Sequence, residues 1–213
     1  MSDNIISSEV ILRWLDLCAK SFQEHKGELT ALDAAIGDAD HGANMARGFT
    51  AVQDKLPSLQ GKDIGAIFKT AAITLISTVG GASGPLYGTF FLQAALTAAD
   101  KTSLNPSELA TVFEAGLQGL MSRGKAIVGD KTMVDAFAPS VEALKPRDDD
   151  GGGQALDRAV TAAKQGAEAT VPLVARKGRA SYLGERSAGH KDPGSVSTLL
   201  LFEALQQAAR PPS

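Results

Sequence analysis

The chain has 213 residues, a formal net charge of −3, 44% hydrophobic residues and 21% charged residues. This length suits one domain with a large core, and so small a charge gives no electrostatic footprint for nucleic acid or a membrane surface. Cys18 is the only cysteine, which excludes a disulfide within the chain, and the N-terminus has no secretion signal. We therefore expect a single cytoplasmic domain over residues 1–213 that binds neither nucleic acid nor membrane.

The hydrophobic pattern predicts an all-α fold, because Ala is abundant, strand-like alternation is nearly absent and apolar residues recur at helical spacing. Gly27 is expected to end the first helix, and Pro139 to kink or break the seventh. Mostly short turns between consecutive helices favour an up-and-down antiparallel arrangement. The expected helices cover about 8–26, 29–36, 41–57, 63–79, 85–100, 105–124, 133–144, 155–176 and 192–205.

The stretch 145–154, between the seventh and eighth expected helices, contains three consecutive Asp followed by three Gly. We expect a solvated surface linker there rather than a metal site. The stretch 177–192 is a second long irregular segment, and loops of this length are usually functional or disordered.

Three carboxylates, Asp33, Asp38 and Asp40, lie within eight positions, and the last two sit in a glycine-flanked turn. Carboxylate oxygens grouped in this way suit Mg²⁺, which also keeps waters and substrate phosphates as ligands. The alternative is a polar loop in which one Asp caps the next helix. The residues alone leave both interpretations open.

Four irregular segments are expected to share one end of the helical array, because each is separated from the next by two helices. They are 37–44, 80–85, 124–132 and 177–192. The second precedes a helix N-terminus and is suited to an anion, although a structural turn is the commoner meaning of such a loop. The fourth is basic and can either close over an anion or remain a solvated loop. Together with the carboxylates, they resemble the parts used in phosphoryl transfer.

His41 follows the carboxylates directly. Metal ligation, phosphorylation and contact with a phosphate or ribose are all open to a histidine in this place. Beside three carboxylates, we favour a nucleotide contact over phosphorylation.

Four strings in register carry a family resemblance: GDADHGANM, GGASGPLYGTFF, SRGKAIVGDKTM and RKGRASYLGERSAGHKDPG. At these strings, and over nearly the whole chain, the sequence resembles the L subunits of dihydroxyacetone kinases. The resemblance implies an up-and-down antiparallel eight-helix barrel that holds a nucleotide and two Mg²⁺ ions at one end. The implied metal ligands are Asp33, Asp38 and Asp40. The implied nucleotide contacts are His41, Gly42, Ala43, Asn44, Ala82, Ser83, Gly124, Met133, Arg179, Asp192, Pro193 and Gly194.

The resemblance also implies a phosphotransferase subunit that is inactive without partners. Tightly bound ADP would be phosphorylated to ATP by a phosphohistidine of an M subunit, fed from phosphoenolpyruvate through the phosphotransferase system. The γ-phosphoryl would then pass to dihydroxyacetone held covalently on a K subunit. Arg179 would offset phosphate charge, and no residue of this chain is assigned as a general acid or base.

Two other functions remain open. One is the L half of a split, ATP-dependent kinase for another small ketose or polyol, and the other is a nucleotide-loaded regulatory binding protein. A homodimer is also left open.

Overall fold

The computed structural model describes residues 5–147 and 153–210. Within these ranges, nine α-helices account for most of the chain, as expected for an all-α fold. The three consecutive Asp of the expected surface linker, at 148–150, lie outside the described residues. The helices are α1 (Ser8–Glu24), α2 (Lys26–Ile36), α3 (His41–Gln53), α4 (Ile64–Thr78), α5 (Ser83–Thr97), α6 (Pro106–Gly124), α7 (Val134–Ala143), α8 (Gln154–Ala169) and α9 (Pro193–Ala209).

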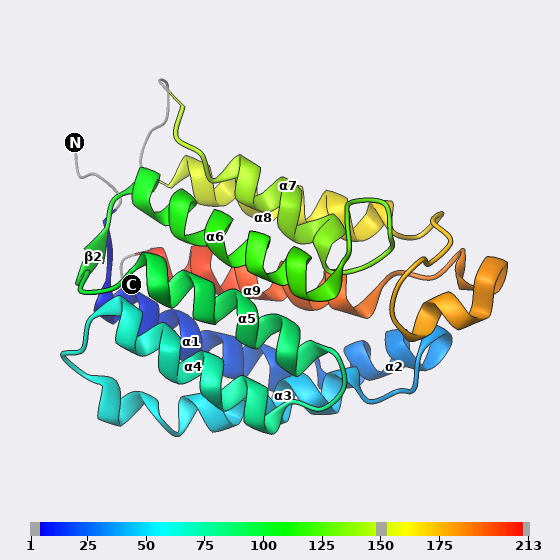
Figure 1. Ribbon diagram of the computed structural model, residues 1–213, viewed down its shortest axis with the longest axis horizontal. Coiled ribbons are helices and arrows are strands. Elements are labelled where there is room, and N and C mark those ends of the chain that lie inside the picture. The colour runs from blue at the N-terminus through cyan, green and yellow to red at the C-terminus, as the bar shows by residue number, and fades with distance from the viewer. Residues whose placement is uncertain (1–4, 148–152, 211–213) are drawn as a thin grey trace.

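Eight of these helices close into a barrel. Each barrel helix packs against the next one in the order α1, α3, α4, α5, α6, α7, α8 and α9, and α9 packs against α1 to close the ring. Neighbouring helices run antiparallel (Figure 1). The expected eight-helix barrel is therefore confirmed, and α2 is an additional helix that extends one end of it.

Large apolar side chains fill the barrel. Trp14 is fully buried, its ring stacks on Phe113 with 5.6 Å between centroids, and it meets Phe68 edge-on at 6.0 Å. The indole Nε1 donates a hydrogen bond to the carbonyl oxygen of Leu201, so the one polar atom of this side chain is satisfied inside the core. The aromatic cluster joins helices from both ends of the sequence.

The two ends of the barrel are different. At one end, the two-residue strands β1 (Ile6–Ser7) and β2 (Ser103–Leu104) pair antiparallel. At the opposite end lie α2, the loops before α3, α5 and α7, and a 3₁₀ segment, η2 (Arg179–Ser187) (Figure 1). A shorter 3₁₀ helix, η1 (Leu56–Leu59), lies between α3 and α4. This arrangement separates a structural end from the end that gathers the conspicuous loops.

Several helix boundaries differ from the sequence-based expectation. Gly27 lies inside α2, because α1 ends at Glu24 and α2 begins only two residues later. Helix α7 continues through Pro139 to Ala143, so the proline does not end it. Helix α8 ends at Ala169 rather than near residue 176, which places Pro172 in the following turn, where its missing N–H costs no helical hydrogen bond.

Among the described residues, no helix is long and apolar enough to span a bilayer.

Candidate functional site

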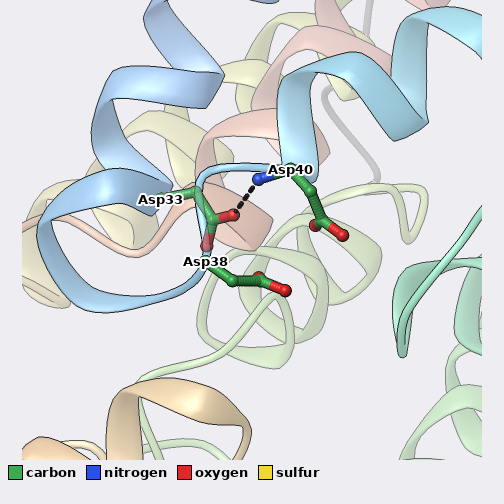
Figure 2. A group of neighbouring side chains, drawn as sticks. All are labelled: Asp33, Asp38 and Asp40. Atoms are coloured by element: carbon green, nitrogen blue, oxygen red, sulfur yellow. Dashed lines mark hydrogen bonds between the residues drawn. The ribbon is translucent and has the colours of Figure 1, made fainter.

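The three carboxylates of the acidic cluster converge. Asp33 lies near the end of α2, while Asp38 and Asp40 lie in the turn that leads into α3, and one ligand oxygen from each lies within 4.8 Å of the others. Figure 2 shows the carboxylates of Asp38 and Asp40 directed to the same side of the turn as that of Asp33. Three hard oxygen donors at this separation fit the ligand preferences of Mg²⁺.

Backbone hydrogen bonds hold this turn in shape. One carboxylate oxygen of Asp33, Oδ2, accepts from the backbone N–H of Asp40 at 2.8 Å and from that of His41 at 3.1 Å. A side chain at Gly37 would place its Cβ 2.0 Å from the other oxygen of Asp33. Gly37 is therefore required by the close approach of the Asp33 carboxylate, and Asp33 both shapes the turn and faces the cluster.

Arg179, at the start of η2, forms an ion pair with Asp38, with 2.9 Å between Nε and Oδ2. The Arg179 side chain is 64% exposed, so solvent screens this pair and little free energy opposes its separation. The guanidinium therefore stands at the rim of the acidic cluster, where it can exchange Asp38 for another anion.

A pocket of about 470 Å³ opens beside the cluster. All four irregular segments contribute to its walls, so the structure places them at one end of the barrel, as counting helices predicted. The sequence-predicted residues that line it are Asp33, Asp38, Asp40, His41, Ala82, Ser83, Gly124, Met133, Arg179, Asp192, Pro193 and Gly194.

Gly42, Ala43 and Asn44 are not among the lining residues. The Asn44 side chain accepts a hydrogen bond from the Arg47 guanidinium at 2.6 Å and lies under Gly80, where a Cβ would meet it at 3.1 Å. A Cβ at Gly42 would lie 2.1 Å from the carbonyl oxygen of Lys26. In this structure Gly42 lets α3 pack against α2, and its direct contact with a nucleotide stays a prediction.

Gly42→Ala is expected to destabilise the protein by about 1–3 kcal/mol, because the added methyl overpacks the α2–α3 contact. A thermal melt of the ligand-free protein measures this loss. Gly27→Ala, in α2, is the matched control: its Cβ meets nothing within 4 Å, and alanine favours the helix. Equal melting temperatures for the two variants would contradict the packing role.

His41 is buried at the N-terminus of α3 and hydrogen-bonded through both ring nitrogens. Nδ1 lies 3.1 Å from the hydroxyl of Ser83, and Nε2 lies 3.0 Å from the hydroxyl of Ser197. Burial lowers the pKa of His41, while the charges of Asp33 and Asp40 act in the opposite direction. The lowered pKa favours a neutral ring.

Lys131 is a pocket residue that sequence reasoning missed. Its side chain is 1% exposed, and the ammonium donates to the carbonyl oxygens of Thr170, at 2.6 Å, and of His190. Burial lowers the pKa of this ammonium, and Asp192 and Asp135 oppose the shift. The motif GDKTM contained the signal, but nothing in it predicted that the lysine would bind carbonyls far along the chain.

Asp135 is a second residue that was missed. Its carboxylate accepts from the backbone N–H of Gly129 at 2.5 Å and from that of Thr132 at 2.7 Å. These bonds fold the segment between α6 and α7 into the tight loop that carries Lys131 and Met133 to the pocket. An Asp three residues after the Thr of the motif was the available signal.

Asp192 caps α9 by accepting from the backbone N–H of Ser195 at 2.7 Å. Burial raises the pKa of Asp192 to about 7; the Ser195 hydrogen bond lowers it, the Asp135 charge raises it, and Lys131 lowers it. In the ligand-free protein the folded state therefore holds this proton up to a higher pH than the unfolded chain, whose Asp titrates near pH 4.

Replacing Asp192 tests this shift. Because the folded state binds more protons, the wild-type carboxyl costs stability as pH rises from about 4 to about 7, and the full cost remains above that range. Asp192→Asn keeps an oxygen for the Ser195 N–H and cannot ionise. The ligand-free variant should thus gain in melting temperature over wild type at pH 8, and this gain should shrink at pH 5. A difference that is the same at both pH values would contradict the raised pKa.

The helical barrel presents a carboxylate triad, a helix N-terminus and a basic segment to one pocket. These are the features expected of a protein that binds a phosphate ligand together with a metal ion. The DAK2 domain model matches residues 35–207. The chain is 48% identical to the PEP-dependent dihydroxyacetone kinase ADP-binding subunit DhaL of Escherichia coli, over 96% of this chain and 99% of that protein. It is also 48% identical to an ADP-binding subunit DhaL of Listeria innocua, over 92% of this chain and 94% of that one.

A solved structure agrees with these similarities. The dihydroxyacetone kinase from C. freundii, in complex with AMP-PNP and Mg²⁺, superposes with a TM-score of 0.71 at 26% identity over 92% of this chain. This chain spans about a third of that kinase, 33% of its length. The chain therefore belongs to the DAK2 domain family, within the group of DhaL subunits of dihydroxyacetone kinase.

Proposed function

We propose that the chain is the ADP-binding phosphotransferase subunit of a phosphoenolpyruvate-dependent dihydroxyacetone kinase. ADP stays tightly bound, a phosphohistidine of an M subunit phosphorylates it to ATP, and the γ-phosphoryl passes to dihydroxyacetone held covalently on a K subunit. The observation that carries the proposal is the convergence of Asp33, Asp38 and Asp40 at a pocket, in a chain similar over nearly its whole length to an ADP-binding subunit.

The acidic cluster would hold two Mg²⁺ ions, whose chemistry is to neutralise and bridge phosphate oxygens. Asp38 and Asp40 offer carboxylates from the turn, and Asp33 offers its second oxygen because the first is engaged by backbone N–H groups. Asp33 is buried, so its position is set by the fold rather than by solvent. This preorganisation favours a defined metal geometry over a loose acidic surface.

The remaining pocket walls suit the other parts of a nucleotide. The loop from Gly80 to Ala82 leads into the N-terminus of α5, where free backbone N–H groups and the helix dipole favour phosphate. Met133 and the neighbouring Leu86 and Leu120 line the pocket with apolar surface suited to a purine ring. Arg179 would offset phosphate charge once Asp38 binds a cation.

No residue of this chain is assigned as general base, and the sugar substrate would be held by the K subunit. The chain alone should therefore not turn over dihydroxyacetone. Its contribution would be to bind, orient and neutralise the phosphates, which are the main requirements of phosphoryl transfer.

Nucleotide content and exchange test this function. The purified chain is denatured and the released nucleotide is quantified; loss of bound labelled ADP is then followed against excess unlabelled ATP. Near-stoichiometric ADP that hardly exchanges is expected, because the nucleotide would be a cofactor recharged in place. Fast exchange would instead favour the half of a split, ATP-using kinase, and absence of any nucleotide binding would overturn both.

A further inference from the structure

A network of buried hydroxyl groups lies behind His41. Tyr87 of α5 and Ser197 of α9 are both fully buried, and the Tyr87 hydroxyl oxygen lies 2.7 Å from that of Ser197. Ser197 contacts Nε2 of His41, and Nδ1 of His41 contacts Ser83, which lines the pocket. This network of hydrogen-bonding groups therefore runs from the interior of the barrel to the pocket wall through a single imidazole ring.

The donors and acceptors in this network determine which ring nitrogen of His41 carries the hydrogen. Ser197 has one hydroxyl hydrogen, and its hydroxyl oxygen lies 2.9 Å from the carbonyl oxygen of Gly194, which can only accept. If Ser197 donates there, it must accept from both Tyr87 and Nε2 of His41. In a ring that carries one hydrogen, Nδ1 is then the acceptor, and Ser83 must donate to it. One hydrogen then lies in each of the four contacts: Ser197–Gly194, Tyr87–Ser197, His41–Ser197 and Ser83–His41.

The opposite tautomer leaves one contact without a hydrogen. If Nδ1 carried the hydrogen, Ser197 would have to donate to Nε2, and its oxygen would face the Gly194 carbonyl oxygen at 2.9 Å with no hydrogen between them. Thr198 donates to the same carbonyl at 2.9 Å and the Tyr87 hydroxyl lies 3.5 Å from it, but neither of these donors places a hydrogen between the Ser197 and Gly194 oxygens. Burial raises the pKa of Tyr87 well above its usual value, so its hydroxyl remains a donor.

We propose that Ser197 and Tyr87 are positioning residues that hold His41 as the Nε2–H tautomer, so that Ser83 donates to His41 and presents only oxygen lone pairs to the pocket. Ser83 then meets a ligand as an acceptor, for a hydroxyl group or a metal-bound water, and not as a donor to a phosphate oxygen. The tautomer itself is independent of the proposed function, whereas the role of Ser83 toward a nucleotide rests on that proposed function.

The tautomer is measured in the ligand-free wild-type chain by long-range ¹H–¹⁵N correlation spectra of ¹⁵N-histidine-labelled protein at neutral pH. The chain has three histidines, and the His41 signals are assigned by their loss in His41→Gln. The expected pattern is that of Nε2–H. A dominant Nδ1–H pattern would overturn the proposal while leaving nucleotide binding untouched.

Ser197→Ala tests the positioning role. It removes the acceptor of Nε2–H, so the His41 signals should shift toward a mixture of tautomers. The release of bound ADP in Mg²⁺ should accelerate roughly five- to tenfold, the size expected for loss of one buried hydrogen bond. Tyr87→Phe keeps the Ser197 acceptor and should shift the His41 signals in the same direction by less; it also serves if Ser197→Ala does not fold.

Ser140→Ala is the matched control. Ser140 is fully buried in α7, and its hydroxyl donates only to the Ala136 carbonyl of its own helix, at 2.7 Å. This variant should leave both the His41 spectrum and the ADP release rate unchanged. Equal effects of Ser197→Ala and Ser140→Ala, or no effect of Ser197→Ala on the spectrum, would overturn the positioning role. If no nucleotide binds at all, the proposed function fails and the spectra still decide the tautomer.

Discussion

Asp38→Ala should abolish stable binding of Mg²⁺ and, with it, retention of ADP. Asp38 is one of three carboxylates whose oxygens lie within 4.8 Å of one another, so its loss removes charge and a ligand from closely spaced cations. We expect the affinity for Mg²⁺–ADP to fall at least about a hundredfold, since even partners behind a metal ligand contribute 10–100-fold. Titration calorimetry with ADP in Mg²⁺ measures the loss.

The fold should survive this substitution. Asp38 is about one-third exposed, and its partner Arg179 is mostly exposed, so the lost ion pair contributes little to stability. Asp54→Ala, an exposed carboxylate at the end of α3, is the matched control and should bind Mg²⁺–ADP as wild type does. If Asp38→Ala retained ADP and Mg²⁺ at wild-type occupancy, the metal assignment would be wrong.

Lys131→Met should produce the largest loss of stability. The buried ammonium satisfies the carbonyl oxygens of Thr170, just beyond α8, and of His190, before α9. Methionine fills much of the same volume but donates no hydrogen bond, so both carbonyls lose a charged donor, and that of the fully buried Thr170 has no solvent to replace it. At about 1–3 kcal/mol for each carbonyl left without its donor, we expect a loss of about 2–6 kcal/mol, which corresponds to a fall in melting temperature of roughly 4–24 °C for a chain of this size.

Lys125→Met separates burial from charge. Lys125 lies at the C-cap of α6, six residues before Lys131, and is exposed, so its substitution removes the same charge without opening a buried network. Its melting temperature should stay within about 2 °C of wild type, as for most surface substitutions. A drop for Lys131→Met no larger than that of Lys125→Met would show that the carbonyl contacts do not stabilise the fold.

The order and type of the helices followed from local information. Apolar spacing predicted the helices, and the caps Asp63 and Asn105 lie where their side chains accept from the first turns of α4 and α6. An antiparallel array then placed alternate loops at one end, so the meeting of residues 37–44 with 80–85, 124–132 and 177–192 could be predicted by counting helices. The acidic cluster was equally visible, because its carboxylates are neighbours in the chain.

The helix boundaries near the site depended on tertiary packing. Glycine commonly ends a helix, yet α2 runs through Gly27. Leu29, Asp33 and Ile36 of this helix are buried at this end of the barrel, and their packing holds it in place. Gly42 belongs to a string associated with nucleotide contact, but the structure uses its missing side chain to bring α3 against α2. A local pattern cannot distinguish a glycine needed for a ligand from one needed for a helix crossing.

The polar network behind the pocket was also beyond the sequence. Lys131 reaches carbonyls 39 and 59 residues away, and the ring of His41 joins hydroxyls 42 and 156 residues away. The sequence by itself determined the helices, their alternation and the acidic turn, because each depends on residues a few positions apart. Only the tertiary structure decided which buried donors meet which acceptors, because those pairings arise when distant helices close the barrel and exclude water.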